Sequence, residues 1–161
     1  MTNEVPERIA DYRPSDEQVA GLSSAANLAQ VVVFPRRDGL YPGVASDFVA
    51  LLRETGVKVA YATDPTAAKA WEHKSGIEQV LPAILIAVGD VGTVVSTIDA
   101  IASVVSAVLE RHGPKSQVFL DAGRRKDADG GTVEWVSLKA TGDPKANRQM
   151  VKDVLRGLFE D

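Results

Sequence analysis

The sequence predicts a single domain of the α/β (or α+β) class, built on a four- to five-stranded mixed sheet with flanking helices. Three observations lead to this prediction: a strand–helix–strand pattern over residues 31–61, an apolar run followed by a long apolar helix over 81–109, and a pair of strands near the C-terminal end. The chain has 161 residues, which suits one domain with a sizeable core. Its 45% apolar and 25% charged residues are ordinary for a globular protein.

The first pattern is a parallel βαβ unit. Residues 31–34 form a short, wholly apolar run that ends at Pro35, which is typical of a strand buried on both faces. A helix is expected at about 44–55, and Gly56 stands where a left-handed residue often follows a helix. Residues 57–61 alternate in character, as a second strand does. Two strands joined by a helix over so short a stretch are expected to lie parallel, with a right-handed crossover.

The second pattern, residues 81–109, is the most apolar part of the chain. Residues 81–88 are an unbroken apolar run, the next five residues form a glycine-containing turn, and a helix is expected over 94–110. The polar residues of that helix recur every three or four positions and therefore form one narrow stripe, which we call the polar stripe. The polar stripe consists of Ser96, Asp99, Ser103, Ser106 and Glu110. A helix of this kind is either almost fully buried or packed against a partner.

The third pattern is a C-terminal antiparallel hairpin followed by a closing helix. Residues 117–121 and 132–138 are expected to be strands, joined by a Gly- and Asp-rich loop. The helix is expected over 144–159, where an aspartate cap and a proline at the first helical position mark its start. Residues 1–14 carry two prolines and no periodicity. We therefore expect a loose N-terminal arm at 1–14 and a single domain at 15–161.

Composition argues against several classes of function. A net charge of −4 disfavours nucleic-acid binding, which needs a concentrated basic face. The chain has no cysteine and only two histidines, so disulfides, thiol catalysis and the common zinc sites are not expected. No nucleophile elbow accompanies the histidines, and we expect no catalytic residue, no metal site and no cofactor. The first residues lack a basic region followed by an apolar one, so no secretory signal is expected and a cytoplasmic location is predicted.

The turn between the apolar run and the long helix is the candidate ligand-binding site. It carries Gly89, Asp90, Gly92 and Thr93 at a helix start, where backbone N–H groups and the helix dipole can hold a phosphate. The segment lacks the lysine of a P-loop and the third glycine of the dinucleotide-binding motif, and Asp90 would repel an anion. A tight strand-to-helix turn is favoured, and binding of a small molecule or nucleotide phosphate is the alternative.

The polar stripe is the candidate protein interface, through Ser96, Asp99, Ser103 and Ser106. An ionised carboxylate within an apolar helix is costly unless it is paired, so Asp99 either contacts another subunit or lies on an exposed edge. The segment 81–109 is long enough to cross a bilayer, but Asp99 and the lack of flanking basic clusters count against a span. Burial inside a soluble domain is favoured, and partner-dependent burial or membrane association is the alternative.

Three features follow one another from residue 81 onward. They are an apolar strand with a glycine turn at 83–93, an apolar helix that ends in basic residues at 108–112, and, after the hairpin, a short closing helix at 150–159. This order resembles the effector-associated constant component family of bacterial conflict systems. The resemblance covers roughly the C-terminal half, and residues 1–40 depart from it. It implies a non-catalytic component that acts with partner proteins in bacterial immunity or conflict, and it supplies no catalytic residues.

These observations together predict a non-enzymatic protein-interaction module or adaptor in a bacterial conflict or immunity system. We expect a homo-oligomer, or docking onto a protein partner such as an effector, through the helix at 94–110. The alternative function is binding of a small molecule or nucleotide phosphate at 89–93. For an enzyme the sequence offers only dispersed carboxylates.

Overall fold

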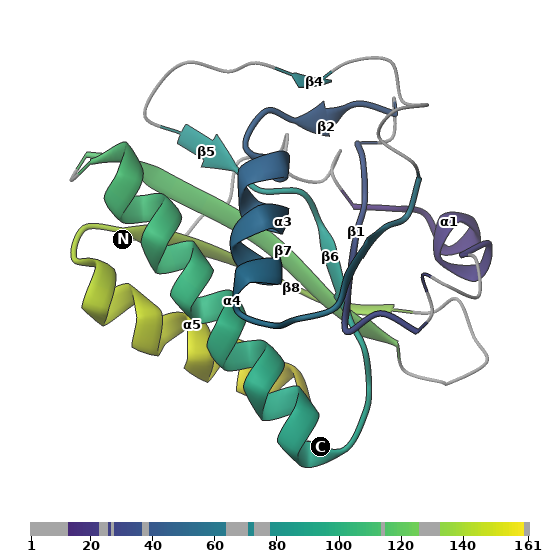
Figure 1. The fold of residues 1–161 in the computed structure, drawn as a ribbon. Coiled ribbons are helices and arrows are strands. Elements are labelled where there is room, and N and C mark those ends of the chain that lie inside the picture. Colours follow the sequence, from purple (N-terminus) through teal and green to yellow (C-terminus); the bar gives the residue numbers. More distant parts are fainter. Residues whose placement is uncertain are drawn as a thin grey trace.

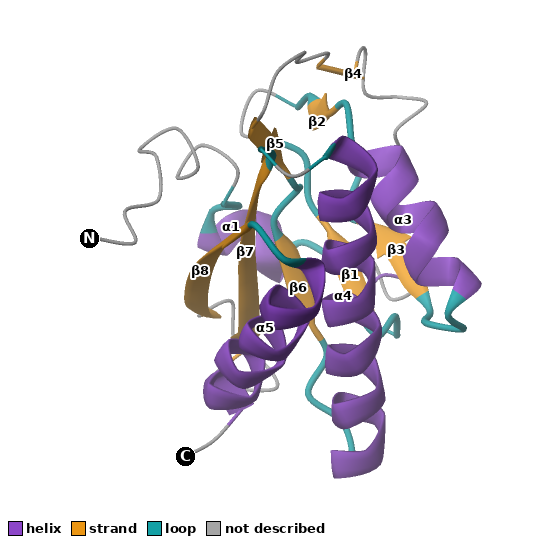
Figure 2. Cartoon of the chain, turned by 90° about the vertical axis from the view of Figure 1, so that its left-hand side faces the viewer, coloured by secondary structure: helices purple, strands orange, loops and turns teal. Residues whose placement is uncertain are grey.

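A computed structural model gives the arrangement of the chain (Figure 1). The residues that the structure describes are 13–22, 26, 28–36, 39–63, 71–72, 78–113, 115–125 and 133–159. Within them, helices α3, α4 and α5 cover one face of a β-sheet and the short helix α1 lies on the other (Figure 2). The predicted N-terminal arm lies outside the described residues except for Arg13 and Pro14.

The elements of the described part are four helices, a main sheet and a small separate pair of strands. The helices are α1 (Asp16–Ala20), α3 (Ala45–Glu54), α4 (Val91–His112) and α5 (Pro144–Phe159). The main sheet consists of β1 (Val31–Val33), β3 (Val59–Tyr61), β5 (Glu78–Val80), β6 (Ile84–Ile86), β7 (Gln117–Arg125) and β8 (Val133–Thr141). The separate pair is parallel and consists of β2 (Tyr41–Pro42) and β4 (Trp71–Glu72).

The main sheet is mixed and runs in the order β3-β1-β6-β7-β8 (Figure 1). Strand β8 pairs along the whole length of β7, so β5 and β6 both lie on the other edge of β7. Strands β5 and β6 are parallel to β7, whereas β1 is antiparallel to β6 and parallel to β3. Because β5 and β6 share one place beside β7, the sheet is five strands wide. A mixed sheet of this width, with flanking helices in one domain, confirms the predicted fold class.

The predicted βαβ unit is formed by β1, α3 and β3. The two strands are parallel, with Val31 opposite Val59, as the sequence pattern indicated. Gly56 follows the end of α3 with a φ of 92°, a conformation that residues with a Cβ rarely adopt. The glycine therefore ends the helix and turns the chain back toward the sheet, which confirms its predicted role.

Of the segment predicted as one strand at 81–88, only Ile84–Ile86 forms a strand (β6), and β5 ends just before the segment at Val80. Pro82 lies in the interruption and has no N–H to donate to the neighbouring strand. The backbone N–H of Leu81 still donates to the carbonyl of Phe119 at 2.9 Å, which keeps the interrupted segment along β7. Strand β6, helix α4 and strand β7 then make a second parallel crossover, which the sequence patterns did not indicate.

Strands β7 and β8 form the predicted antiparallel hairpin. Gln117 lies opposite Thr141 at one end of the pairing, and Arg125 lies opposite Val133 at the other. Both strands have nine residues and are longer than predicted. The closing helix α5 has the predicted bounds and packs against α4 and β8.

Ser15, with Gln18 three residues further on, predicts a capped helix over about 15–28, and helix α1 begins there but is much shorter. The capping box is present, because Gln18 N–H donates to Ser15 Oγ at 3.2 Å and Ser15 N–H donates to Gln18 Oε1 at 2.8 Å. The helix ends at Ala20 rather than continuing toward residue 28. At its end the N–H of Gly21 donates to the carbonyl of Glu17 at 2.9 Å.

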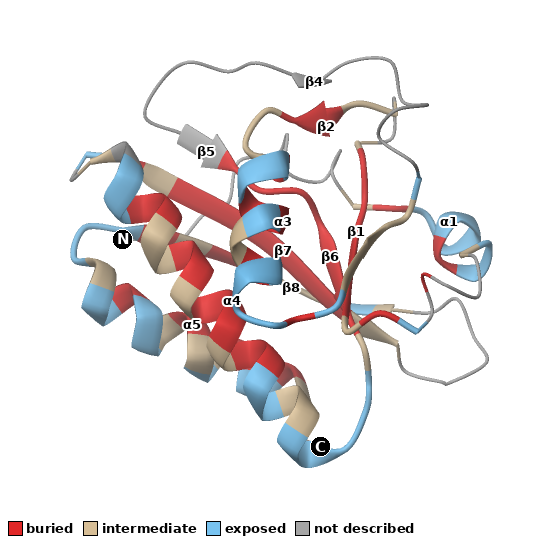
Figure 3. Cartoon of the chain, viewed as in Figure 1, coloured by how far each residue is buried: buried red, intermediate tan, exposed pale blue. Residues whose placement is uncertain are grey.

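Apolar cores lie on both faces of the sheet, and Figure 3 shows buried residues along the sheet and the inner side of α4. Alternate residues of β7 point into the main core beneath α4 and α5, because side chains of a strand alternate between its faces. The main core includes Val118, Leu120, Ala122, Ile98, Ile101, Val105, Val151 and Leu155. A smaller core, on the face of α1, includes Val19, Ala26, Val32, Phe34 and Leu85, and a third cluster includes Val80, Ala83 and Phe119.

Candidate functional site

The predicted ligand turn is the capped start of helix α4. The helix begins at Val91, three residues earlier than predicted, because Asp90 acts as its N-cap. The backbone N–H of Thr93 donates to Asp90 Oδ1 at 2.9 Å, and the Thr93 hydroxyl donates to Oδ2 at 2.9 Å. Gly89 and Gly92 are exposed on either side of this cap. The four predicted ligand residues therefore do lie together, but their polar groups bond to one another.

The charge at this turn opposes an anion. The hydrogen bond from the Thr93 N–H, followed by the one from the Thr93 side chain, lowers the pKa of Asp90 below its ordinary value. The carboxylate is thus ionised at neutral pH, and it holds the N–H that a phosphate would need. This arrangement gives no support to the alternative function of phosphate binding at 89–93.

The polar stripe of α4 faces helix α5 over part of its length. Asp99 Oδ1 is buried, and the ammonium of Lys152 lies 3.4 Å from it. Further along the helix, Ser106 Oγ donates to the carbonyl of Pro144 at 2.5 Å. Two of the four predicted interface residues are therefore used in packing α4 against α5 within this chain. Of the others, Ser103 is half-buried and Ser96 is exposed.

An apolar patch lies at the start of α4 instead. We use "apolar patch" for Leu28, Val88, Val91 and Val95, which are the large hydrophobic side chains exposed in the described part of the chain. Their exposed fractions are 82%, 60%, 80% and 39%, respectively. Side chains of this size normally lie in the core, so a group of them at one place on a surface is a candidate interaction site.

Backbone pairing brings the members of the apolar patch together. The N–H of Ala87 donates to the carbonyl of Gln30 at 2.9 Å, which extends the antiparallel β1–β6 pairing to the segment beside Leu28. The side-chain amide of Gln30 donates to Thr97 Oγ1 at 3.0 Å, which ties the same segment to α4. Leu28 and Val88 therefore emerge at one end of the sheet, beside the first turn of α4.

The apolar patch is exposed because α3 covers only the far part of α4. At 1.5 Å a residue, the 10-residue α3 spans about 15 Å and the 22-residue α4 about 33 Å. The start of α3 lies beside the end of α4, where Arg111 and Asp47 are 3.5 Å apart. The first turns of α4 extend past the sheet in both views (Figures 1 and 2). Helical periodicity places Val95 on the apolar side, but only the packed structure shows which part of that side stays uncovered.

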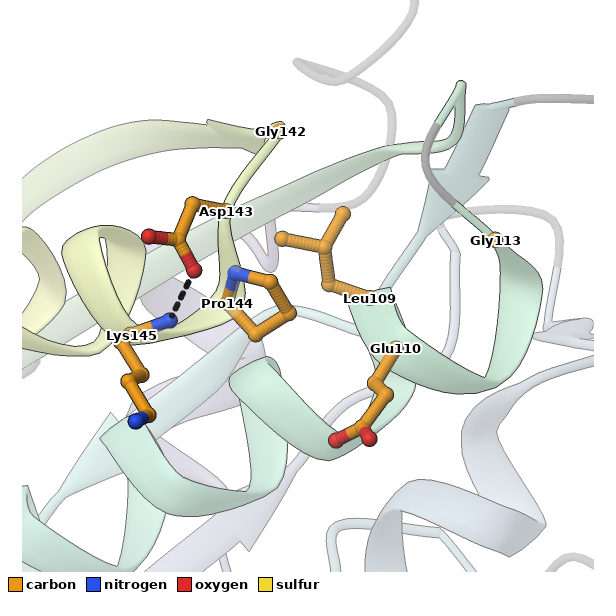
Figure 4. Close-up of a pocket in the computed structure, with 7 residues that line it drawn as sticks. All are labelled: Leu109, Glu110, Gly113, Gly142, Asp143, Pro144 and Lys145. Atoms are coloured by element: carbon orange, nitrogen blue, oxygen red, sulfur yellow. Dashed lines mark hydrogen bonds between the residues drawn. The ribbon is translucent and has the colours of Figure 1, made fainter.

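An open pocket of about 630 Å³ lies at the opposite end of α4 (Figure 4). Its lining comes from the end of α4 and from the turn between β8 and α5: Leu109, Glu110, Gly113, Gly142, Asp143, Pro144 and Lys145. Asp143 Oδ1 accepts a hydrogen bond from the backbone N–H of Lys145 at 3.1 Å. This carboxylate thus caps α5 much as Asp90 caps α4, and it disfavours an anion there too.

The pocket lies at a junction between two helices, α4 and α5. The described residues that line it include no histidine, serine or threonine, and so offer no hydroxyl nucleophile with a neighbouring imidazole base. Glu110 and Lys145 provide one carboxylate and one ammonium group beside apolar surface from Leu109 and Pro144. Elsewhere in the described residues, no group of three or more His, Cys, Asp or Glu side chains is placed to hold a metal ion.

Helix α4 also bears on the question of a membrane. Among the described residues, the stretch Val91–Arg111 is long and apolar enough to cross a bilayer, with a mean hydropathy of 1.8. Half of its most apolar window is buried within the domain, as in the core helix of a soluble protein. The helix is therefore compatible with a soluble protein.

Comparisons with known proteins add no functional assignment. No protein-family model, curated protein or solved structure matches the chain significantly.

Proposed function

We propose that this chain is a non-enzymatic protein-interaction module that associates with a second copy of itself through the apolar patch. The observation that carries this proposal is the exposure of Leu28, Val88, Val91 and Val95 at one end of the domain. Complete burial of a valine or leucine side chain contributes about 1.5–3 kcal/mol. Most of the surface of these side chains is exposed to water in the isolated domain. A partner that covers the patch would bury this surface and so gain the free energy.

The composition of the patch favours a second copy as the partner. A two-fold symmetric interface sets the same surface against itself, so an unpaired charge close to the two-fold axis meets a like charge. Asp90 is the charged residue of the first turn, and both of its oxygens accept hydrogen bonds from Thr93. The neighbouring Gly89 and Gly92 are exposed and carry no side chain, so two backbones can approach closely there. A small apolar interface of this kind is self-complementary and weak.

The resemblance of the C-terminal half to the effector-associated constant component family supports a more specific cellular role for the module. In this proposal the chain is a bacterial cytoplasmic adaptor of a conflict or immunity system, and its oligomer presents a docking surface to an effector. Neighbouring genes test this placement independently of the oligomer. An effector gene next to this one in several genomes is the expected result, and unrelated neighbours throughout would contradict it.

Light scattering on the purified chain over a range of concentrations tests self-association. The native chain should pass from monomer to dimer mass as its concentration rises. Val91→Lys should stay monomeric, because it places an ammonium group on the apolar patch. Ala146→Lys is the matched control, since it adds the same charge at an exposed position of α5 outside the patch and should behave as the native chain does. A native chain that is monomeric at every concentration would overturn the proposal.

A further inference from the structure

A cluster of polar and aromatic side chains, separate from the apolar patch, lies on strands β7 and β8. The register of the hairpin sets Asp121 directly opposite Ser137. Trp135 is two residues from Ser137 and so lies on the same face of the sheet. This face is the one away from α4 and α5, because the intervening Leu120 and Ala122 point into the main core.

Asp121 is almost fully buried on this face. Its exposed fraction is 1%, and it interrupts a run of apolar residues in the middle of β7. An ionised carboxylate at such a position is unfavourable unless cations and hydrogen-bond donors surround it. The hydroxyl of Ser137 donates a short hydrogen bond to Asp121 Oδ1. The remaining donors come from outside the sheet.

Arg13 supplies those donors from a segment 108 residues earlier in the chain. Its Nε lies 2.8 Å from Asp121 Oδ2, and its Nη2 lies 3.4 Å from Asp121 Oδ1. The same Nη2 lies 2.6 Å from Ser137 Oγ. The guanidinium carbon also lies 5.8 Å from the centre of the Trp135 ring, within the range of a cation–π contact.

The three groups on the strands match the three features of a guanidinium group. A carboxylate receives two parallel N–H groups, a hydroxyl oxygen receives one more, and an aromatic ring lies over the cation. The receiving groups are held by strand pairing, whereas Arg13 belongs to the segment that precedes α1, and its side chain is 37% exposed. The accepting groups thus belong to the paired strands, whereas the guanidinium group comes from the segment before α1.

We propose that Asp121, Ser137 and Trp135 form a guanidinium-binding site, which Arg13 fills in this chain. The site accepts an arginine side chain from another extended segment when Arg13 is withdrawn. Ammonium groups fit it poorly, because a single point charge does not reproduce the paired contacts to the carboxylate.

Chemical rescue of Arg13→Ala tests the site. The variant leaves the Asp121 carboxylate without its cation and should have a lower Tm than the native chain. Ethylguanidinium at low millimolar concentration should restore much of the lost Tm in a saturable way, and ethylammonium should not. The Arg13→Ala, Asp121→Asn double variant should lose the response.

Arg148→Ala is the matched control, because it removes an exposed arginine on α5 and should show no response to ethylguanidinium. If Arg13→Ala does not fold, its recovery from denaturant is measured with each cation, and ethylguanidinium alone should raise the yield of folded protein. Three results would overturn the proposal: equal responses to the two cations, equal responses of the two single variants, or an Arg13→Ala chain that neither cation stabilises or refolds.

Discussion

Gly123 of β7 and Trp135 of β8 lie directly opposite each other, and the indole covers the place where a side chain at residue 123 would be. A Cβ built on Gly123 would lie 2.9 Å from Trp135 Cε3 and 2.5 Å from Cγ1 of Val133. Real Cβ contacts are essentially never this close. The missing side chain at residue 123 therefore leaves room for the tryptophan ring, which lies next to the groups that hold Arg13.

Gly123→Ala should destabilise the protein. The added methyl group must displace side chains of a neighbouring strand, and overpacking of this kind typically costs about 1–3 kcal/mol. Urea unfolding followed by circular dichroism measures the change. Gly157→Ala is the matched control, because a Cβ there meets nothing within 4 Å, and an alanine inside a helix should stabilise by about 0.5–1 kcal/mol. A Gly123→Ala variant as stable as the native chain would contradict the expected clash.

Asn147 should be important for joining α5 to β8. Its side-chain oxygen accepts from the Thr141 N–H at 3.2 Å, and its amide group donates to the carbonyls of Thr141 and, at 2.8 Å, of Asp143. Asn147 is only 9% exposed, so Asn147→Ala should leave backbone groups unpaired at a cost of about 1–3 kcal/mol. Asn147→Asp should be no better, because a carboxylate cannot donate to carbonyls.

The control for Asn147 is its neighbour Arg148, which is exposed on α5. Arg148→Ala should change the free energy of unfolding by no more than about 0.5 kcal/mol. The prediction for Asn147 would fail if the two alanine variants unfolded at the same urea concentration.

Local patterns were enough to predict much of the fold. The apolar run at 31–34, the helix that follows it and the glycine at residue 56 predict a parallel crossover, and β1, α3 and β3 form one. The gap around Pro82, between the end of β5 at Val80 and the start of β6 at Ile84, was not predicted, because it depends on which strand lies beside the segment. The second crossover was missed for the same reason, since the pairing of β6 with β7 is decided by tertiary contacts.

The candidate sites were less predictable than the fold. Periodicity correctly grouped Asp99 and Ser106 on one face of α4, but their contacts with α5 connect residues far apart in the sequence. The apolar patch depends on the shortness of α3, which leaves the first turns of α4 uncovered. The partner of Asp121 lies 108 residues away, in a segment predicted to be a loose arm. Local sequence contains no signal for such long-range pairing.

Acid should remove the contribution of the Asp90 cap. Hydrogen bonds from Thr93 lower the pKa of Asp90 in the folded chain below its ordinary value of 3.8. A lowered pKa means that the stabilisation is fully present above the unfolded-state value and is lost as the pH falls through the folded-state value. Asp90→Asn keeps a capping side chain without the charge. Its Tm should therefore be below that of the native chain at neutral pH, and the difference should disappear in acid.

Thermal unfolding of both chains across this pH range is the measurement. Asp153→Asn is the control, because its carboxylate is exposed within α5 and caps no helix. If the Tm difference between the native chain and Asp90→Asn instead grew as the pH falls, the lowered pKa of Asp90 would be contradicted.

Asp99 and Lys152 should be weakly coupled within one chain. Their side chains are 44% and 21% exposed, so solvent screens the ion pair, and pairs of this kind contribute about 0.2–1 kcal/mol. A double-mutant cycle with Asp99→Asn and Lys152→Met should give a coupling energy in this range that decreases in high salt. Neither variant should change the oligomeric mass. A loss of dimer in Asp99→Asn would instead make the polar stripe an interface between subunits.

The apolar patch should make thermal stability depend on protein concentration. Association that involves only the folded state stabilises it by mass action, so the Tm of the native chain should rise with its concentration. Val91 is 80% exposed, and its replacement by lysine removes little packing from the monomer. Val91→Lys should therefore match the native Tm at low concentration and show no rise at high concentration, as measured by scanning calorimetry. A variant with a much lower Tm when dilute would show that Val91 supports the fold of the monomer rather than a contact between copies.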